Sequence, residues 1–163
     1  MIKPVLTAAA AASLVAGCER HEAAAPANQS NAAATTAPAE APLAKTAADP
    51  GLQWGPCAPS FPAGCEVAVL HGDPAKPNAD VFLRVPAGYT IPPHSHTSEE
   101  RMVLVGGTLT VKYQGHPEAT LQAGSYAYGP AKLPHRGTCA AGPCTLFIAF
   151  EGPVDVQPFE GEI

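Results

Sequence analysis

The sequence predicts an all-β fold, a sandwich or a closed barrel, preceded by an N-terminal segment with little to bury. Past residue 50, short runs of Val, Ile, Leu, Phe and Tyr alternate with Gly and Pro turns, and no segment has a helical period. Residues 108–113 alternate Thr or Lys with Leu, Val or Tyr. This alternation is typical of a strand with one wet and one buried face, and many such short strands favour a sandwich or barrel.

Six runs are expected to form strands because each is rich in β-branched, aliphatic or aromatic residues and is bounded by turn residues. In chain order they are Glu66–His71, Asp80–Val85, Arg101–Val105, Thr108–Tyr113, Ser125–Tyr128 and Thr145–Glu151. Pro92 and Pro93 would stiffen the chain before a histidine-rich stretch, and Gly106 and Gly107 are expected to turn it afterwards.

Three metal-capable side chains lie close together in the segment 88–107, which has the sequence G-Y-T-I-P-P-H-S-H-T-S-E-E-R-M-V-L-V-G-G. His94 and His96 are two apart, so in a strand they project from one face, and Glu100 can return to that face after a turn. A further histidine, His135, follows downstream. Imidazole and carboxylate together suit a first-row divalent metal, so the sequence predicts a metalloprotein.

The segment resembles the first motif of the cupin superfamily, G-x5-H-x-H-x3-E-x6-G, which fits without a gap from Gly88 to Gly107. The run from Gly124 to His135 is similar to the second motif, G-x5-P-x-G-x2-H-x3-N. Lys132 stands there in place of glycine, and Cys139 in place of asparagine.

This resemblance covers about residues 66–153 and implies a small bacterial cupin with a single double-stranded β-helix, also called a jelly-roll barrel. It further implies that four side chains hold one divalent transition metal ion, such as Fe, Mn, Ni or Zn. These ligands would be His94, His96, Glu100 and His135.

Several alternatives accompany this site. Glu99 competes with Glu100, because adjacent residues of a strand face opposite sides, although the x3 spacing favours Glu100. The alternative to a metal site is a cupin barrel that has lost its metal or never binds one. His21, His71 and His116 are not part of a ligand motif and are expected to be solvated, with His71 or His116 at the mouth of the barrel as the alternative.

Composition limits the classes of partner. The formal net charge is −5, and the nine Lys and Arg residues are not clustered. The sequence therefore predicts no basic patch that would bind nucleic acid or an anionic membrane surface. Much of the apolar 46% is alanine in the first fifty positions. Only the part from about residue 51 onward is expected to pack a core.

The N-terminus is similar to a bacterial lipoprotein signal. A charged start at Lys3 precedes an apolar stretch over residues 4–16 and small residues before Cys18. Cleavage would leave Cys18 as the acylated first residue, whereas an ordinary secretory leader is the alternative. The stretch is too short to span a bilayer, which needs about 20 residues. Glu19 in place of aspartate favours the outer membrane of a Gram-negative cell.

Residues 19–50 are mostly alanine, proline and small polar residues, which favours a disordered spacer. The expected organisation is a signal peptide over residues 1–17, a flexible tether over 18–50 and a barrel over 51–163. The protein would then be lipid-anchored in the bacterial cell envelope and face the periplasm.

The five cysteines support export. With Cys18 lipidated, the remaining four form two local couples, and in an oxidising compartment disulfides Cys57–Cys65 and Cys139–Cys144 are expected. Reduced thiols and the other pairings are the alternatives. A thiolate metal site is disfavoured because no C-x2-C spacing is present.

The expected function is that of an enzyme of the dioxygenase, isomerase or lyase type that acts on a small oxygen-bearing molecule. The alternatives are a non-catalytic cupin lipoprotein that binds a metal or small ligand, and a structural barrel that has lost its chemistry. The resemblance is also compatible with a homodimer formed through sheet edges. Five polar residues are candidates for the mouth of the site: Tyr89, Arg101, Tyr126, Tyr128 and Lys132.

Overall fold

The computed structural model describes residues 40–163, and its compact unit runs from Pro42 to Ile163. The described residues form nine strands and no helix, so none of their segments is a helix able to cross a membrane. The expected signal peptide, Cys18 and most of the tether lie outside the described residues. The strands are β1 (Trp54–Pro56), β2 (Glu66–His71), β3 (Ala79–Val85), β4 (Thr90–Ser95), β5 (Glu100–Tyr113), β6 (Ala119–Gln122), β7 (Tyr126–Gly129), β8 (His135–Phe150) and β9 (Gln157–Pro158).

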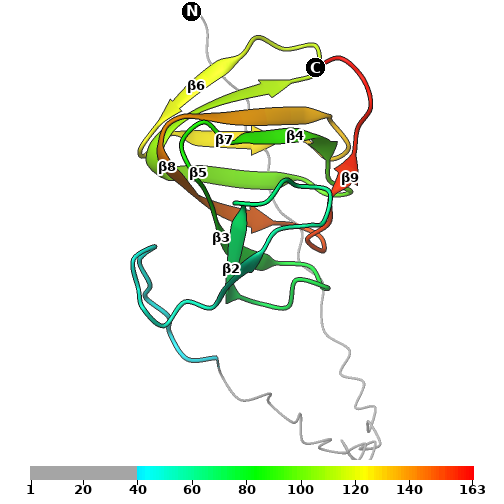
Figure 1. Ribbon diagram of the computed structural model, residues 1–163. Coiled ribbons are helices and arrows are strands. Elements are labelled where there is room, and N and C mark those ends of the chain that lie inside the picture. Colours follow the sequence, from blue (N-terminus) through cyan, green and yellow to red (C-terminus); the bar gives the residue numbers. More distant parts are fainter. Residues whose placement is uncertain (1–39) are drawn as a thin grey trace, which may run out of the picture. The chain divides into compact units, whose positions relative to one another are not determined.

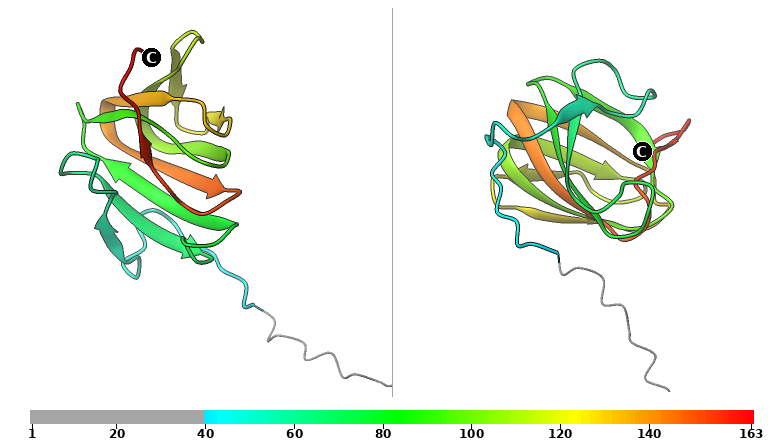
Figure 2. Two further views of the ribbon diagram at one scale, coloured as in Figure 1. Left: turned by 90° about the vertical axis from the view of Figure 1, so that its right-hand side faces the viewer. Right: turned by 90° about the horizontal axis from the view of Figure 1, so that it is seen from below.

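Two long strands organise the sheet, and every pairing in it is antiparallel (Figure 1). β8 pairs with β5 along the whole length of β5, from Glu100 opposite Phe150 to Tyr113 opposite His135. The first half of β8 also pairs with β4, and its second half pairs with β3. Because both long strands bend, the sheet curls on itself into the barrel seen in Figure 2. The predicted all-β barrel is confirmed.

A bulged bend lies where a turn was expected. Gly106 and Gly107 were expected to turn the chain, but they do not end the strand. Residues 100–113 form one strand whose register shifts around Gly106. Gly107 has φ +86°, and a Cβ there would lie 2.7 Å from Pro143 O. Only glycine tolerates both the conformation and this close approach, so β5 bends beside β8 without losing the ladder.

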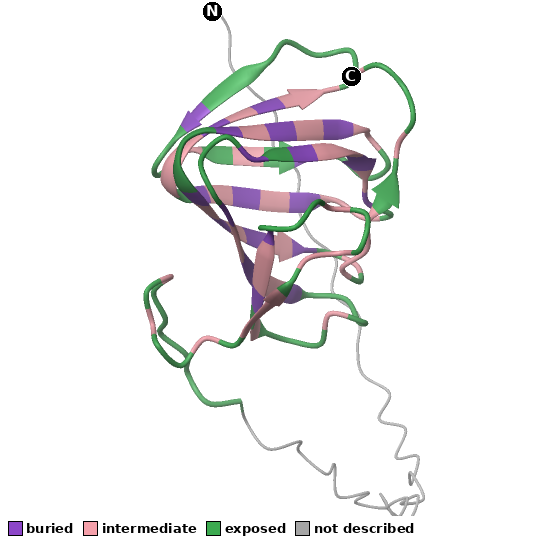
Figure 3. Cartoon of the chain, in the orientation of Figure 1, coloured by how far each residue is buried: buried purple, intermediate pink, exposed green. Residues whose placement is uncertain are grey.

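The core lies inside the curl, where every second side chain is buried (Figure 3). Leu109 and Val111 are 2% and 4% exposed, which confirms the alternation predicted for residues 108–113. Leu104 and Leu146 face each other across β5 and β8 and are fully buried. The apolar interior therefore supports the strand ends on which the polar site is built.

Both expected disulfides form. Cys139–Cys144 is fully buried within β8, where the strand bends. Cys57–Cys65 closes the loop between β1 and β2, and Tyr89 Oη donates to Pro62 O of this loop at 2.6 Å. The loop closed by Cys57–Cys65 is thereby attached to the barrel next to the site described below.

Candidate metal centre

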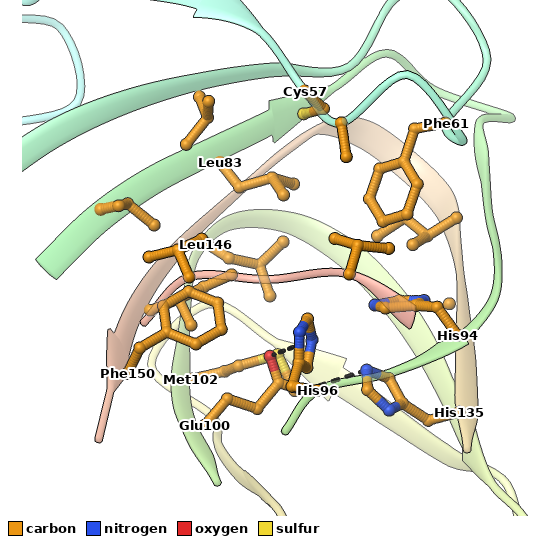
Figure 4. A pocket seen from close by; sticks show the side chains of 18 of the residues that line it. Cys57, Phe61, Leu83, His94, His96, Glu100, Met102, His135, Leu146 and Phe150 are labelled. Atoms are coloured by element: carbon orange, nitrogen blue, oxygen red, sulfur yellow. Dashed lines mark ion pairs between the residues drawn. The ribbon is translucent and has the colours of Figure 1, made fainter. Parts of the chain in front are cut away.

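Three histidines and a glutamate meet inside the barrel although they come from distant parts of the sequence (Figure 4). His94 lies on β4, His96 follows the end of β4, Glu100 begins β5 and His135 begins β8. In the β4–β8 ladder His94 is the direct partner of His135. All four side chains are buried, with 2–6% of their surface exposed.

Backbone carbonyls orient the three imidazole rings. The Nδ1 atoms of His94, His96 and His135 lie 2.7 Å from Pro92 O, 2.5 Å from Asp155 O and 3.1 Å from Leu133 O. Because a carbonyl only accepts hydrogen bonds, each Nδ1 must donate its proton, and each neutral ring keeps a lone pair on Nε2. This is the tautomer in which histidine binds a metal through Nε2.

The remaining nitrogen atoms and the Glu100 carboxylate converge. One ring nitrogen of each histidine lies within 4.8 Å of the others. Glu100 Oε1 is 3.0 Å from His135 Nε2, and Glu100 Oε2 is 3.4 Å from His96 Nε2. Ligands at about 2.1 Å from one ion, at angles near 90° to 109°, are roughly 3.0–3.4 Å apart. The separations of the carboxylate from these two rings therefore fit a shared ion.

A buried oxygen without a hydrogen-bond partner provides the test of this fit. Glu100 Oε1 makes no hydrogen bond within the described part of the chain. In the neutral form of the neighbouring His135, the ring has no proton on Nε2 when Nδ1 donates to Leu133 O, and two acceptors then face each other at 3.0 Å. Leaving a buried carboxylate oxygen in this state is costly, and a cation between the acceptors removes the cost. The donor set of imidazoles and carboxylate suits a divalent transition metal.

In the absence of a metal, the pKa values of His94, His96 and Glu100 are shifted from their ordinary values. Burial, with the neighbouring His135 as a second cause, lowers the pKa of His94 from 6.5 to about 4. Burial opposes ionisation of Glu100, but His135 and His96 outweigh it and lower the pKa of this carboxyl. Burial likewise opposes protonation of His96, yet the adjacent Glu100 raises the pKa of this ring. A proton held between His96 and Glu100 thus competes with a metal for the same electron pairs.

Gly129 is a site residue that sequence reasoning missed. It pairs with Glu100 across β5 and β7, and a Cβ at Gly129 would lie 2.7 Å from Glu100 Oε1 and 2.8 Å from its Cγ. Gly129 falls among the variable positions of the second cupin motif, so no motif signal marks it. Its lack of a side chain leaves the space into which the carboxylate extends.

A cavity of about 280 Å³ opens beside the four polar residues. Its walls are mainly aliphatic and come from β2, β3, β5 and β8, and Figure 4 shows Leu83, Leu146 and Phe150 pointing into it. Phe61, from the Cys57–Cys65 loop, contacts His94 edge to face with ring centroids 5.0 Å apart. Sequence reasoning also missed Phe61, because nothing in the loop sequence indicates that it lies above a histidine on β4.

The five residues expected at the mouth of the site do not line this cavity, and that expectation needs correction. Arg101 follows the inward-facing Glu100 and so faces outward, where it pairs with Glu151 at 2.7 Å. Tyr126 and Tyr128 lie opposite Val103 and Arg101 and are 59% and 48% exposed.

The remaining two candidates have structural roles. Tyr89 is buried and holds the disulfide loop through Pro62 O. Lys132 is exposed, but its backbone adopts φ +63°, and its N–H donates to His96 O at 2.8 Å. The left-handed conformation explains why the motif has glycine at this place.

The other acidic and histidine candidates lie apart from the site. Glu99 is partly exposed and lies 3.9 Å from Arg101, whereas Glu100 is the buried carboxylate. His71 and His116 are exposed and do not belong to the three-histidine group. His21 falls outside the described residues.

Comparison with known proteins places this chain among the cupins. It is 29% identical over 89 residues to dimethylsulfoniopropionate lyase DddQ of Ruegeria pomeroyi, a match that spans 52% of this chain and only 44% of that relative. The crystal structure of DddQ from R. pomeroyi aligns with a TM-score of 0.59 at 22% identity, covering 68% of this chain and 64% of the other.

An acetylacetone dioxygenase from Acinetobacter johnsonii aligns with a TM-score of 0.57 at 19% identity, covering 75% of this chain and 79% of the other. An RmlC-like cupin from Ralstonia eutropha aligns with a TM-score of 0.52 at 26% identity, covering 65% and 73%. These likenesses support the fold. A family model described as the ChrR cupin-like domain matches residues 46–155, over the barrel that carries the three histidines. The chain therefore belongs to the ChrR-like family of cupins.

Proposed function

We propose that His94, His96, Glu100 and His135 hold one divalent transition metal ion, and that the centre acts on an oxygen atom of a small molecule in the adjoining cavity. The observation that carries this proposal is the convergence of three oriented imidazoles on a buried Glu100 oxygen that has no hydrogen-bond partner within residues 40–163. When bound, such a metal supplies Lewis-acid polarisation of a substrate oxygen or, if it is iron, a centre for dioxygen chemistry.

The residues of the chain have distinct parts in this proposal. The histidines present neutral Nε2 atoms because Nδ1 is committed to a carbonyl, and Glu100 offsets part of the metal's charge inside an apolar barrel. The aliphatic walls exclude water and strengthen the electrostatic interaction with a bound oxygen atom. A lyase and a dioxygenase among the similar proteins support chemistry of these two types.

The test is metal content together with turnover. The full chain, purified from its own host without chelator, should carry about one metal ion per chain, and His135→Ala should lose it. His116→Ala is the matched control, because His116 is exposed and lies outside the group. Equal metal content in all three proteins would refute the ligand assignment. Iron or manganese should further support turnover, followed as oxygen uptake or as cleavage of small oxygen-bearing compounds.

A non-catalytic binding protein is the second candidate, and one observation favours it. Apart from the four site residues, the charged side chains along the cavity are engaged elsewhere: Asp155 accepts from Thr97 N and Gln157 Nε2, and Arg136 pairs with Glu118. If neither of these side chains moves a proton, the site would hold its ligand unchanged. Tightly bound zinc with no turnover of any compound would select this candidate.

We also propose that the protein is anchored to the cell envelope through a lipid on Cys18, with residues 18–50 as a tether and the barrel in the periplasm. The two disulfides support an oxidising compartment. The test compares membrane partition of the full chain with that of Cys18→Ser. The variant should leave the membrane fraction, whereas continued partition would show that Cys18 is not the anchor.

A further inference from the structure

We infer that the substrate or ligand of this site is an apolar small molecule with a single oxygen-bearing, metal-binding end and no second anionic group. This inference rests on the proposed metal centre, since it names the class of molecule that the same site accepts. The reasons lie in the distribution of polar and apolar groups around the cavity.

The polar groups of the cavity are gathered at one end. His94, His96, Glu100 and His135 lie together, as Figure 4 shows, and the walls away from them are aliphatic. The aliphatic residues that line the cavity include Val67, Val81, Leu83, Leu146 and Ile148. A bound molecule therefore meets donors to one metal at one end and mainly apolar side chains beyond it. Such surfaces favour apolar atoms and disfavour a charge that would lose its hydration without a partner.

Among the residues that the structure describes, no cation along the cavity is free to hold a second anionic group. Within residues 40–163, no lysine lines the cavity, and Arg136 is the arginine that does. Arg136 follows the inward-facing His135 in β8, so its guanidinium group lies on the outer face, where Nη2 is 3.7 Å from Glu118 Oε2. A dicarboxylate or a phosphorylated compound would find no positive partner beyond the metal.

The carboxylates along the cavity cannot hold a second anionic group either. Glu100 is committed to the histidine group, and both carboxylate oxygens of Asp155 accept hydrogen bonds, from Thr97 N at 3.0 Å and from Gln157 Nε2 at 2.9 Å. A second negative charge would therefore meet carboxylates or be buried against aliphatic side chains.

The size of the cavity limits the ligand. A volume of about 280 Å³ is at the small end for binding sites and holds roughly nine water-sized groups at about 30 Å³ each. Phe61 narrows the space beside His94, and its loop is held by the Cys57–Cys65 disulfide and by Tyr89. A short alkyl or single-ring compound fits this space.

The test uses the full chain loaded with Co²⁺, whose visible absorption reports both metal binding and coordination of a ligand. The probes are three hydroxamic acids, which bind metals through two oxygen atoms: acetohydroxamic acid, hexanohydroxamic acid and the monohydroxamate of adipic acid. The last replaces the terminal methyl group of the second by a carboxylate. Dissociation constants are measured by titration.

Each buried methylene group raises affinity about fourfold. Hexanohydroxamic acid, with four more methylene groups than acetohydroxamic acid, should therefore bind at least about tenfold and at most about 250-fold more tightly. The adipic monohydroxamate should lose at least about tenfold relative to hexanohydroxamic acid, because its carboxylate meets aliphatic walls. Equal affinities for the three probes, or tightest binding of the adipic derivative, would overturn the inference while leaving the metal centre intact.

Two variants distinguish the contribution of the cavity wall to probe binding from that of the metal. Leu83→Gln should weaken hexanohydroxamic acid by about tenfold and leave acetohydroxamic acid and the cobalt spectrum unchanged. Val69→Gln, a change on the 44% exposed residue of β2, is the control and should alter neither probe. If wild type shows no cobalt absorption at all, the proposed metal centre itself fails, and the inference fails with it.

Discussion

His94 and His135 lie directly opposite each other in the ladder between β4 and β8, with their ring centroids 4.3 Å apart. One belongs to the first histidine motif and the other to the second. Because β8 begins beside the end of β4, this single pairing unites the two motifs at one point inside the barrel. Metal binding should therefore depend on both segments together and should report on the closure of the barrel.

Metal binding is expected to stabilise the folded protein. A metal that binds only the native state at 100 times its dissociation constant adds about 2.7 kcal/mol to the free energy of unfolding. Glu100→Gln keeps the shape of the side chain but removes its charge, so it should weaken metal binding at least about tenfold and reduce this gain. Thermal unfolding of wild type and Glu100→Gln, with and without added Zn²⁺, measures the stabilisation by the metal in each protein. An equal rise in Tm for wild type and Glu100→Gln would show that Glu100 is not a ligand.

Gly129→Ala should disturb Glu100 without touching a histidine. The added methyl group would lie 2.7 Å from Glu100 Oε1, so either the carboxylate or strand β7 must move. We expect a loss of about 1–3 kcal/mol in the free energy of unfolding, as for other overpacked sites, together with weaker metal binding. Gly55→Ala is the matched control, because a Cβ there meets nothing within 4 Å. Equal effects of both changes on metal affinity would rule out a positioning role for Gly129.

The metal-free protein should be most stable near pH 6.5. The pKa of His94 is about 4 when folded and 6.5 when unfolded. As pH falls from 6.5 to 4, His94 becomes protonated in the unfolded chain but stays neutral in the folded protein. This difference lowers the free energy of unfolding by up to about 3 kcal/mol. The lowered pKa of Glu100 adds a further loss at more acidic pH.

The raised pKa of His96 acts in the opposite direction. Stability from its protonated form is complete below pH 6.5 and is lost as pH rises through its folded-state pKa. Urea unfolding of chelator-treated protein between pH 4 and 8 would reveal this maximum. His94→Gln should remove the loss between pH 6.5 and 4, and a slope that persists in this variant would assign it to other groups.

Lys132→Gly should stabilise the protein slightly. The left-handed backbone at Lys132, with φ +63°, costs a non-glycine residue about 1–2 kcal/mol, and glycine would remove this cost. Glycine also makes the unfolded chain more flexible, which offsets about 0.5–1 kcal/mol of the improvement. The net effect should be a rise of about 0.5 kcal/mol in the free energy of unfolding. Lys132→Ala keeps the Cβ and should show no gain. If alanine stabilised as much as glycine, the effect would come from the lost charge and not from the backbone.

Local spacing in the sequence was sufficient for much of this protein. The alternation over residues 108–113 indicated a half-buried strand, and the bounds expected for Glu66–His71 are those of β2. The close spacing of Cys57 with Cys65 and of Cys139 with Cys144 favoured the disulfides that form. These features depend on neighbours in the chain, because strand periodicity and short loops act over a few residues.

Other features were decided only by how distant strands pair. The outward direction of Tyr126 and Tyr128 follows from their register with β5, and the need for glycine at Gly129 follows from its place opposite Glu100. Phe61 reaches His94 only because its loop folds across the barrel. The sequence by itself determined the fold class and the residue types of the site. The tertiary structure decided which side chains surround them, because register and curvature are set by contacts between segments far apart in the chain.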